Sequence, residues 1–393
     1  MENGSEKTPQ AFKKEIGAET LLFPIIFAAV FALFAFKMGV ANALNTMMNT
    51  AYALLIDTVL YITAICVIMG AVSALLSEFG FVSLANRFLQ PLMRPVYGLP
   101  GAASLGVVTT FLSDNPAILA LADDAYFRHY FKAYQFPALT NLGTSFGMGL
   151  IVCTYMLSLS GKAGQSMALA VGMGLAGAVV GSVVSTRIML HFTKKIYGKD
   201  APAGSFSTNA EVPPHMRPVR AGSIGSRMMD AILDGGQSGV RMGVSIVPGV
   251  LIICTLVMML INGPSASGAY TGAAYEGIRL LPVLAEKLDF ILTPLFGFSS
   301  PEAIGVPVTA LGAAGAAIGL SSTLVSQGLA GAGDVAVFTA MCMCWSGYLS
   351  THASMMDSLH CKNLIGKAIL SHTIGGLCAG AAAHWLFVLF SIL

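Results

Sequence analysis

A broken apolar segment from Gly101 to Phe127 places the strongest constraint on how this chain can fold. Two apolar arms of about a dozen residues, each roughly 18 Å long as a helix, flank the polar sequence Ser113–Pro116. Neither arm is long enough to cross a hydrocarbon core of about 30 Å. Asp114 and Asn115 are favourable N-cap residues and Pro116 suits the first helical position, so a second helix is predicted to start here.

The segment is therefore predicted to be a re-entrant helical hairpin with its polar tip at membrane depth. Irregular backbone is tolerated there only where it is buried in protein or lines a cavity, and interrupted helices mark the binding sites of transporters. The alternative is a pair of short helices joined by a solvated turn. Of 393 residues, 55% are hydrophobic and 10% are charged, whereas about a quarter are charged in soluble domains. We therefore expect an all-α polytopic membrane protein that contacts the lipid bilayer, and the net charge of +2 gives no reason to expect a nucleic-acid partner.

Long apolar runs predict the transmembrane helices. They lie at Leu21–Phe36, Ala53–Leu76, Leu139–Leu159, Gln165–Phe192, Val240–Ile261, Val335–Met356 and Leu364–Phe390. Two amphipathic stretches, Phe81–Arg94 and Ile278–Leu292, fit helices that lie in the membrane interface, and Ser299–Gly333 is a second broken apolar segment. The polar interruption Lys37-Met38 favours an uncleaved first helix over a signal peptide.

The order crossing, interfacial helix, broken hairpin, crossing, crossing occurs twice. Aligning Arg94–Ala117 without gaps on Thr293–Ala316 pairs prolines and glycines with one another and places Ser113–Pro116 on Gly312–Gly315. Each half has an odd number of crossings, so the halves must enter the membrane from opposite sides. We predict an inverted structural repeat, each half with three transmembrane helices, an interfacial helix and a re-entrant helical hairpin, plus one extra N-terminal helix. The predicted segments are 1–52 for the tail and first helix, 53–192 for repeat 1, 193–239 for a loop-like cytoplasmic connector and 240–393 for repeat 2.

The connector is rich in basic residues, which are Lys194, Lys195, Lys199, Arg217, Arg220 and Arg227. The positive-inside rule places it in the cytoplasm, and the N-terminus then lies in the cytoplasm as well. The first hairpin would enter from the cytoplasm and the second from outside, an arrangement typical of alternating access. We expect the protein in the cell membrane, and specifically in a prokaryotic inner membrane, with a homo-oligomer among its expected states.

Polar residues at the first tip are the leading candidates for solute binding. They are Ser113, Asp114 and Asn115. Asp114 is expected to bind a cation or the hydroxyl groups of a solute, or else only to cap the second arm. A carboxylate is costly in the membrane interior, which favours a functional role.

Further candidates lie at the second hairpin and in the crossings that follow each hairpin. They are Asn141, Ser145, Ser299, Ser300, Glu302, Ser346 and Ser350. Ser300 and Glu302 have an alternative role as the cap and first-turn acid of a helix. The serines also have the alternative role of hydrogen bonding between transmembrane helices, although equivalent positions in both repeats favour a shared site.

Other chemistries lack support in the sequence. Among the histidines, only the group Asp357, His360 and Cys361 approaches the spacing of metal ligands, and the cysteines form no disulfide or zinc pattern. Gly-x-Ser-x-Gly occurs at residues 143–147 and Gly-x-Gly-x-x-Gly at residues 172–177, but both lie inside predicted crossings and not in a strand–helix context. We therefore expect no enzyme, no metal site and no cofactor, apart from a coupling Na+ or H+.

The two hairpins and their order resemble the nucleoside-recognition, or gate, family of membrane proteins. The resemblance rests on Ser113–Ala117 and Phe296–Gly305, and it covers about residues 53–192 and 240–390. This family is similar to concentrative nucleoside transporters, the ferrous-iron permease membrane domain and spore maturation proteins. The resemblance implies an ion-coupled secondary transporter of a small polar solute, with a nucleoside or nucleobase as the expected class. The alternative that it implies is a non-transporting assembly or signalling scaffold.

Overall fold

The computed structural model describes residues 15–115, 117–118, 128, 130–201, 203, 219–265 and 267–392, which are mostly helical. The N-terminal tail at 1–14, the second arm of the first hairpin at 119–127 and the connector residues 202 and 204–218 lie outside the described residues. The helices before the connector are α1 (Ala18–Met38), α2 (Val40–Ala53), π-helical η1 (Leu54–Val59), α3 (Leu60–Glu78), α4 (Phe81–Leu92), π-helical η2 (Met93–Tyr97), α5 (Ala103–Leu112), α8 (Ala138–Thr144), α9 (Gly149–Ser158), α10 (Ser160–Ala163) and α11 (Ala168–Tyr197).

The helices after the connector follow the same order. They are α12 (Ile224–Ser245), α13 (Val247–Gly249), π-helical η3 (Val250–Cys254), α14 (Thr255–Ile261), α15 (Leu280–Lys287), α16 (Asp289–Phe296), η4 (Pro301–Ile304), α17 (Gly305–Gly312), α18 (Ala314–Ser326), α19 (Ala332–Trp345), α20 (Tyr348–Ser358), η5 (Lys362–Leu364) and α21 (Ile365–Ile392). The fold is all-α and polytopic, as predicted.

The predicted register of the repeat is confirmed by the backbone. In that register Phe81 pairs with Leu280, and these residues begin α4 and α15. Gly98 and Gly297 also pair, and both adopt the left-handed conformation, with φ of +76° and +58°, at the turn into each hairpin. Glycine suits this turn because it has no Cβ to oppose a positive φ.

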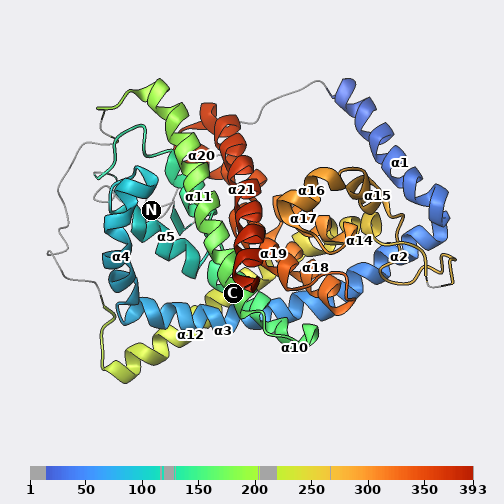
Figure 1. The fold of residues 1–393 in the computed structure, drawn as a ribbon, viewed down its shortest axis with the longest axis horizontal. Helices are drawn as coiled ribbons and strands as arrows, with labels where there is room; N and C mark the ends of the chain where they lie inside the picture. The colour runs from blue at the N-terminus through green and yellow to red at the C-terminus, as the bar shows by residue number, and fades with distance from the viewer. Residues whose placement is uncertain are drawn as a thin grey trace.

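The helices α11 and α21 show that the repeats are inverted. These equivalent helices lie side by side (Figure 1). Gly177 faces Ala383, whereas Ser185 faces Gly375, so the two helices run in opposite directions. Small residues along both helices let the backbones approach closely, which is the usual basis of helix association in lipid.

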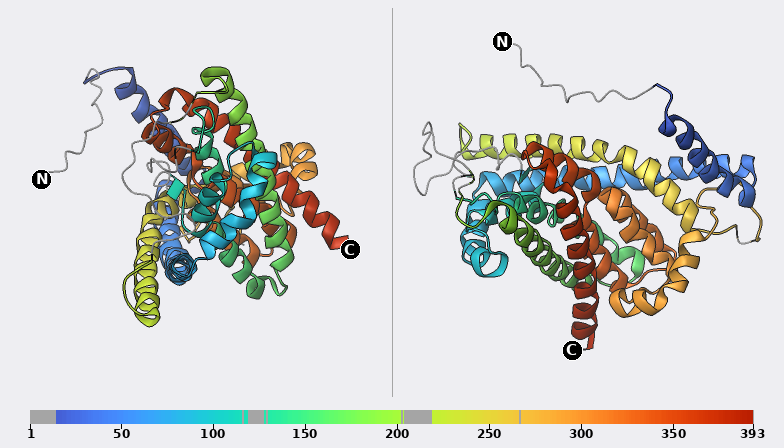
Figure 2. Two further views of the ribbon diagram at one scale, coloured as in Figure 1. Left: turned by 90° about the vertical axis from the view of Figure 1, so that its left-hand side faces the viewer. Right: turned by 90° about the horizontal axis from the view of Figure 1, so that it is seen from above.

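The helices α3 and α12 form a second antiparallel pair. Gly235 packs on Gly70 and Gly239 packs on Cys66, and both views in Figure 2 show the two helices together. They belong to apolar segments of 39 residues (Val40–Glu78) and 38 residues (Ile224–Ile261). At 1.5 Å per residue each segment is nearly 60 Å long, about twice the hydrocarbon thickness, so neither fits within the hydrocarbon core along the membrane normal.

The prediction that the connector is loop-like from Lys194 to Gln237 is wrong at both ends. The helix α11 continues to Tyr197, and α12 begins at Ile224. Ser223 caps α12 by accepting a hydrogen bond from the amide of Ser226 at 3.2 Å. The glycines and charges of this segment suggested a loop, but Gly235, Gly239 and Gly243 form a face that packs on α3, and Arg227 of the same helix pairs with Glu78 at the end of α3.

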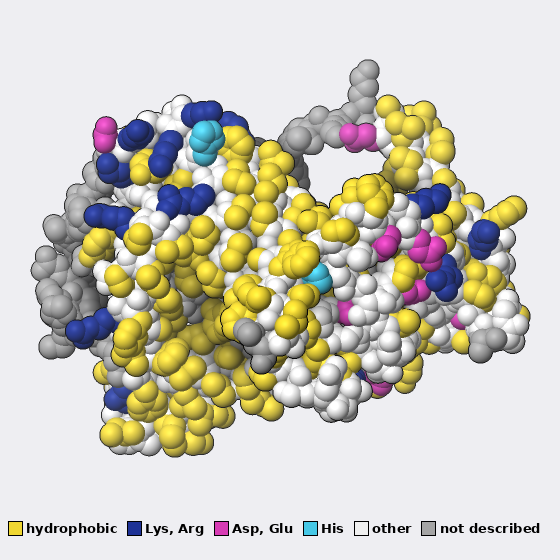
Figure 3. All heavy atoms as spheres, in the orientation of Figure 1, with side chains coloured by type: hydrophobic (Ala, Val, Ile, Leu, Met, Phe, Trp, Pro, Cys, Tyr) yellow, Lys and Arg dark blue, Asp and Glu magenta, His cyan; other side chains and the backbone are white. Residues whose placement is uncertain are grey.

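Within the described residues, six helical segments are long and apolar enough to cross a membrane. The predicted crossing at Val335–Met356 is not among them, and it is divided into α19 and α20. The helix α1 stands apart from the rest (Figure 1) and buries only Phe34 and Met38. On the face shown in Figure 3, hydrophobic side chains cover most of the surface, and Lys and Arg side chains gather near the C-terminal end of α11, where the last turn carries Lys194 and Lys195.

The α11–α21 seam gives a direct test of the packing. A Cβ at Gly181 would lie 2.5 Å from both the Ala379 Cβ and the Gly375 carbonyl oxygen, whereas a Cβ at Gly172, on the same helix, would meet nothing within 4 Å. Gly181→Ala should lower the free energy of unfolding by about 1–3 kcal/mol because it overpacks the seam. Gly172→Ala should be neutral or stabilising by up to about 1 kcal/mol. Thermal unfolding of both variants in detergent would show this difference, and equal melting temperatures would contradict it.

Candidate functional site

The first hairpin ends its helical arm at Ser113, as the sequence predicts. The hydroxyl of Ser113 donates to the Thr109 carbonyl at 2.8 Å, and Asp114 Oδ1 accepts from the Asn115 amide at 2.7 Å. Asn115 is buried, its Nδ2 donates to the Ser346 carbonyl at 2.9 Å, and its Oδ1 has no hydrogen-bond partner among the described residues. The tip is therefore anchored in the protein interior and keeps one acceptor free.

Two crossings that were predicted to be continuous are interrupted. The crossing at Leu139–Leu159 is divided into α8 and α9, and the crossing at Val335–Met356 is divided into α19 and α20. The breaks lie at equivalent positions, since Met148 and Gly347 pair in the register of the repeat and have φ of +54° and +65°. A positive φ at the non-glycine residue Met148 costs energy, and such strain gathers at functional sites.

The second hairpin breaks at Ala313, between α17 and α18. This break falls in the predicted segment Gly312–Gly315. The Gly347 amide donates to the Ala310 carbonyl at 3.0 Å, and a Cβ at Gly347 would lie 3.1 Å from the Gly312 carbonyl oxygen. The second tip therefore packs against the break between α19 and α20.

The break at Ser346-Gly347 joins both hairpins. Its Ser346 carbonyl accepts from the first tip, and its Gly347 amide donates to the end of α17 in the second hairpin. A hydrogen bond that is lost at an interrupted helix must be replaced inside a membrane, and here the two hairpins supply the partners. The structure thus brings the two tips to one place in the protein interior.

A cavity of about 240 Å³ lies beside the first tip, between α3, α9 and α12. Its lining residues are Cys66, Gly70, Ser73, Ala74, Leu112, Ser113, Ile151, Arg220, Asp234, Gly235, Ser238, Gly239 and Met242. Asp114 lies close enough to Cys66 to interact with it electrostatically. The volume is just below the roughly 300–1,000 Å³ of pockets for drug-sized ligands, so it suits a smaller polar solute.

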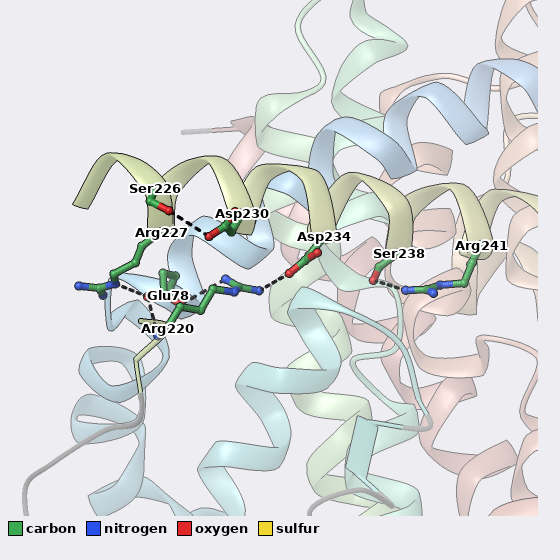
Figure 4. Close-up of polar contacts among 8 residues, drawn as sticks. All are labelled: Glu78, Arg220, Ser226, Arg227, Asp230, Asp234, Ser238 and Arg241. Atoms are coloured by element: carbon green, nitrogen blue, oxygen red, sulfur yellow. Dashed lines mark hydrogen bonds and ion pairs between the residues drawn. The ribbon is translucent and has the colours of Figure 1, made fainter. Parts of the chain in front are cut away.

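An ion-pair network borders this cavity (Figure 4). Arg227 Nε lies 2.7 Å from Glu78 Oε1, and Arg220 contacts both Glu78 Oε2 at 3.2 Å and Asp234 Oδ2 at 3.0 Å. The Glu78 side chain is only 8% exposed, so the two guanidinium groups compensate the cost of burying its charge. The network holds the end of α3 against α12 and fixes the charged wall of the cavity.

The predicted residues at the base of the second hairpin lie apart from the tips. The hydroxyl of Ser299 donates to Asp334 Oδ2 at 2.6 Å. Asp334 lies in the first turn of α19, and Ser346 follows the end of that helix, so about 18 Å separates the two levels. Glu302 forms an ion pair with Arg279 at 3.1 Å, and the buried Ser300 hydroxyl has no partner among the described residues. A cavity of about 160 Å³ lies against Ser299 and Ser300.

The predicted residues on the interrupted crossings pack near the tips. Asn141 Nδ2 donates to Ser185 Oγ at 2.9 Å and to the Ala368 carbonyl at 3.0 Å. Ser145 donates to the Asn141 carbonyl at 2.8 Å. Ser346 is buried at the break, and Ser350 lies on α20 with its side chain outside the described part. The structure thus gathers Ser113, Asp114, Asn115, Asn141, Ser145 and Ser346 around the tips, while their binding roles remain predictions.

Sequence reasoning missed the two interrupted crossings and the wall that α12 contributes to the cavity. The signal for the first break was the sequence Gly143-Thr-Ser-Phe-Gly147-Met-Gly149, and Ser346-Gly347 was the signal for the second. Short or glycine-interrupted segments at corresponding positions of two halves indicate such breaks. The α12 wall was missed because Arg220, Asp234 and Ser238 were assigned to the connector.

The packing of the first tip can be tested by substitution of Gly147. A Cβ at this position would overlap Asn115 Oδ1 and lie 3.0 Å from Ser346 Oγ. Asn115 cannot withdraw without losing its bond to Ser346, so Gly147→Ala should lower the free energy of unfolding by about 1–3 kcal/mol. Gly161→Ala, where a Cβ would meet nothing within 4 Å, is the matched control. Identical thermal unfolding of both variants would show that Asn115 of the tip does not pack against Gly147.

Comparisons with known proteins identify solved structures with a similar fold. No family model matches the chain, and no curated protein matches it. Solved structures of CNTnw, a concentrative nucleoside transporter, are similar. One is an inward-facing, substrate-bound state, with a TM-score of 0.52, 12% identity and coverage of 94% of this chain and 84% of that chain. Another is a variant in an outward-facing state, with a TM-score of 0.52, 16% identity and coverage of 95% and 85%. This protein is thus an all-α, multi-pass membrane protein with the fold of these transporter structures.

Proposed function

We propose that this protein is a secondary-active transporter that moves a small polar solute, a nucleoside or nucleobase, across the membrane by alternating access with ion coupling. The observation that carries the proposal is the meeting of two oppositely inserted hairpins at the Ser346-Gly347 break, beside a cavity with a charged wall. The likeness to transporter structures caught in inward-facing and outward-facing states supports the same cycle.

In the proposed site the first tip binds the solute. Ser113 lines the cavity, and Arg220, Asp234, Ser73 and Ser238 supply further polar groups that suit a solute with several hydroxyl or amide groups. The buried Oδ1 of Asn115, which has no partner among the described residues, can accept a hydrogen bond from a hydroxyl or amide group of the solute.

Uptake by proteoliposomes tests the proposal. The purified protein is reconstituted, and labelled nucleosides, nucleobases, amino acids and carboxylates are offered with an inward Na+ gradient or an inward H+ gradient. We expect gradient-driven accumulation of a nucleoside or nucleobase above empty liposomes. Accumulation of another solute class would overturn the substrate assignment, and no accumulation of any solute would overturn transport. In that case a stable partner in pull-downs, without a rise in melting temperature with any solute, would favour the assembly scaffold.

Asp114 gives a residue-level test. Asp114→Asn keeps an oxygen that can accept from the Asn115 amide, so the tip should fold, but it removes the charge that we assign to binding. We expect uptake to fall at least about tenfold, which corresponds to 1.4 kcal/mol, with an unchanged melting temperature. Asp200→Asn is the control because that carboxylate is 97% exposed and lies away from the tips. Uptake by Asp114→Asn equal to that of the control would remove Asp114 from the site.

A further inference from the structure

Two buried histidines lie just beyond the Ser346-Gly347 break and have no role in the site described so far. His352 on α20 and His372 on α21 are both 0% exposed, and their ring centroids are 4.5 Å apart. The ring of Tyr348 lies against both, at 5.6 Å and 5.2 Å. Ionisable groups inside a membrane protein are costly and commonly mark ion or proton sites.

The hydrogen bonds of His372 define its protonation state. Its Nε2 lies 2.5 Å from the Cys344 carbonyl oxygen, which can only accept, so Nε2 carries the hydrogen. Its Nδ1 lies 2.9 Å from Ser185 Oγ, and Ser185 Oγ in turn accepts from Asn141 Nδ2 at 2.9 Å. With a neutral imidazole the bonds form one directed chain, from Asn141 to Ser185 to His372 to Cys344.

This chain connects both interrupted crossings. Asn141 lies in α8, one turn before the first break, and Cys344 lies in the last turn of α19, before the second break. The carbonyl of Ser346, two residues after Cys344, holds the tip residue Asn115. A change in the charge of His372 therefore affects the ends of α8 and α19, which lie at the breaks that hold the tip of the first hairpin.

His352 offers free sites for a proton. Both ring nitrogens are buried, and neither has a hydrogen-bond partner among the described residues. The other titratable groups around the pair are Tyr348 on α20 and Cys344 on α19. Two helices that pack on α20, α8 and α17, contain no ionisable residue. Asp357, near the end of α20, pairs with Lys362 at 2.9 Å.

We propose that His352 and His372 together bind the coupling proton of the transport cycle. This inference rests on the proposed transport function and names H+ as the coupling ion. One proton adds to the pair, either at a free nitrogen of His352 or at Nδ1 of His372, while repulsion between rings whose centroids are 4.5 Å apart disfavours a second. No covalent bond other than N–H forms or breaks.

The geometry also defines what the proton changes. When His372 Nδ1 carries a hydrogen, Ser185 can no longer donate to the ring, and its hydroxyl hydrogen must turn to another acceptor. The Asn141 amide has a free Oδ1 and can rotate to accept it, which breaks the bond from Nδ2 to the Ala368 carbonyl. Protonation thus loosens α8 from α21 next to the first break, and this step links the proton to movement of the hairpin.

The proton site is tested by NMR of the full-length protein in detergent, with 13C at the Cε1 of its seven histidines. Resonances are assigned with His352→Gln and His372→Gln and followed from pH 5 to pH 8. We expect the two signals to titrate together as one proton, and each substitution to move the midpoint of the remaining signal by about 0.5 pH unit or more. Ser185→Ala keeps both histidines and should also move the midpoint. The exposed His191 and His360 are controls whose signals should not respond to these substitutions. Absence of any titration of the pair would overturn the proton site, whether or not transport is found.

Coupling is tested separately with labelled uridine and adenosine in proteoliposomes. Uptake by the unsubstituted protein should rise several-fold with an inside-alkaline pH gradient, and in His372→Gln the ratio of uptake with and without the gradient should fall to about one. Gln retains a donor for the Cys344 carbonyl, so the fold should persist, and His360→Gln should keep the ratio of the unsubstituted protein. A gradient response that survives in both His352→Gln and His372→Gln would overturn the assignment. If the unsubstituted protein takes up neither solute, the proposed function fails, and the NMR titration still decides whether the pair binds a proton.

Discussion

The structure depends on the need to satisfy every backbone polar group inside a membrane. Among the described residues four apolar segments are interrupted, and each break leaves amides and carbonyls without their helical hydrogen bonds. These groups pair with one another: the Ser346 carbonyl with the Asn115 side chain, and the Gly347 amide with the Ala310 carbonyl. The breaks are therefore stable only as a group, which is why two hairpins from different halves of the chain converge on one place.

Small residues make this convergence possible. Glycine and alanine on α11 and α21, and glycine on α3 and α12, let antiparallel helices pack with almost no side chain between them. Close packing replaces the hydrophobic driving force that is absent between helices in lipid. Polar side chains then have few positions in the interior, and they gather where the helices are interrupted. The cavity beside the first tip and the histidine pair beyond the second break both follow from this arrangement.

The proposed solute site and the proposed proton site share structural elements. The solute cavity borders Ser113, and the hydrogen-bond chain of His372 ends on Cys344, two residues before the carbonyl that holds Asn115. A ligand can shift a conformational equilibrium only by as much as it prefers one state. The shared break provides a physical route by which proton and solute can prefer the same state of the hairpin.

The sequence alone determined the membrane class, the all-α fold, the inverted repeat and the positions of both hairpin tips, because length, hydropathy and helix-capping residues act locally. It predicted continuous crossings where α8–α9 and α19–α20 are interrupted, because a long apolar run looks the same whether or not its backbone is broken. Only tertiary structure decided these breaks, since a lost helical hydrogen bond at Ser346-Gly347 is acceptable only when another segment replaces it. The same holds for α12, whose glycines resemble a loop until they meet α3, and for His352 and His372, which lie on different helices and become a pair only by packing.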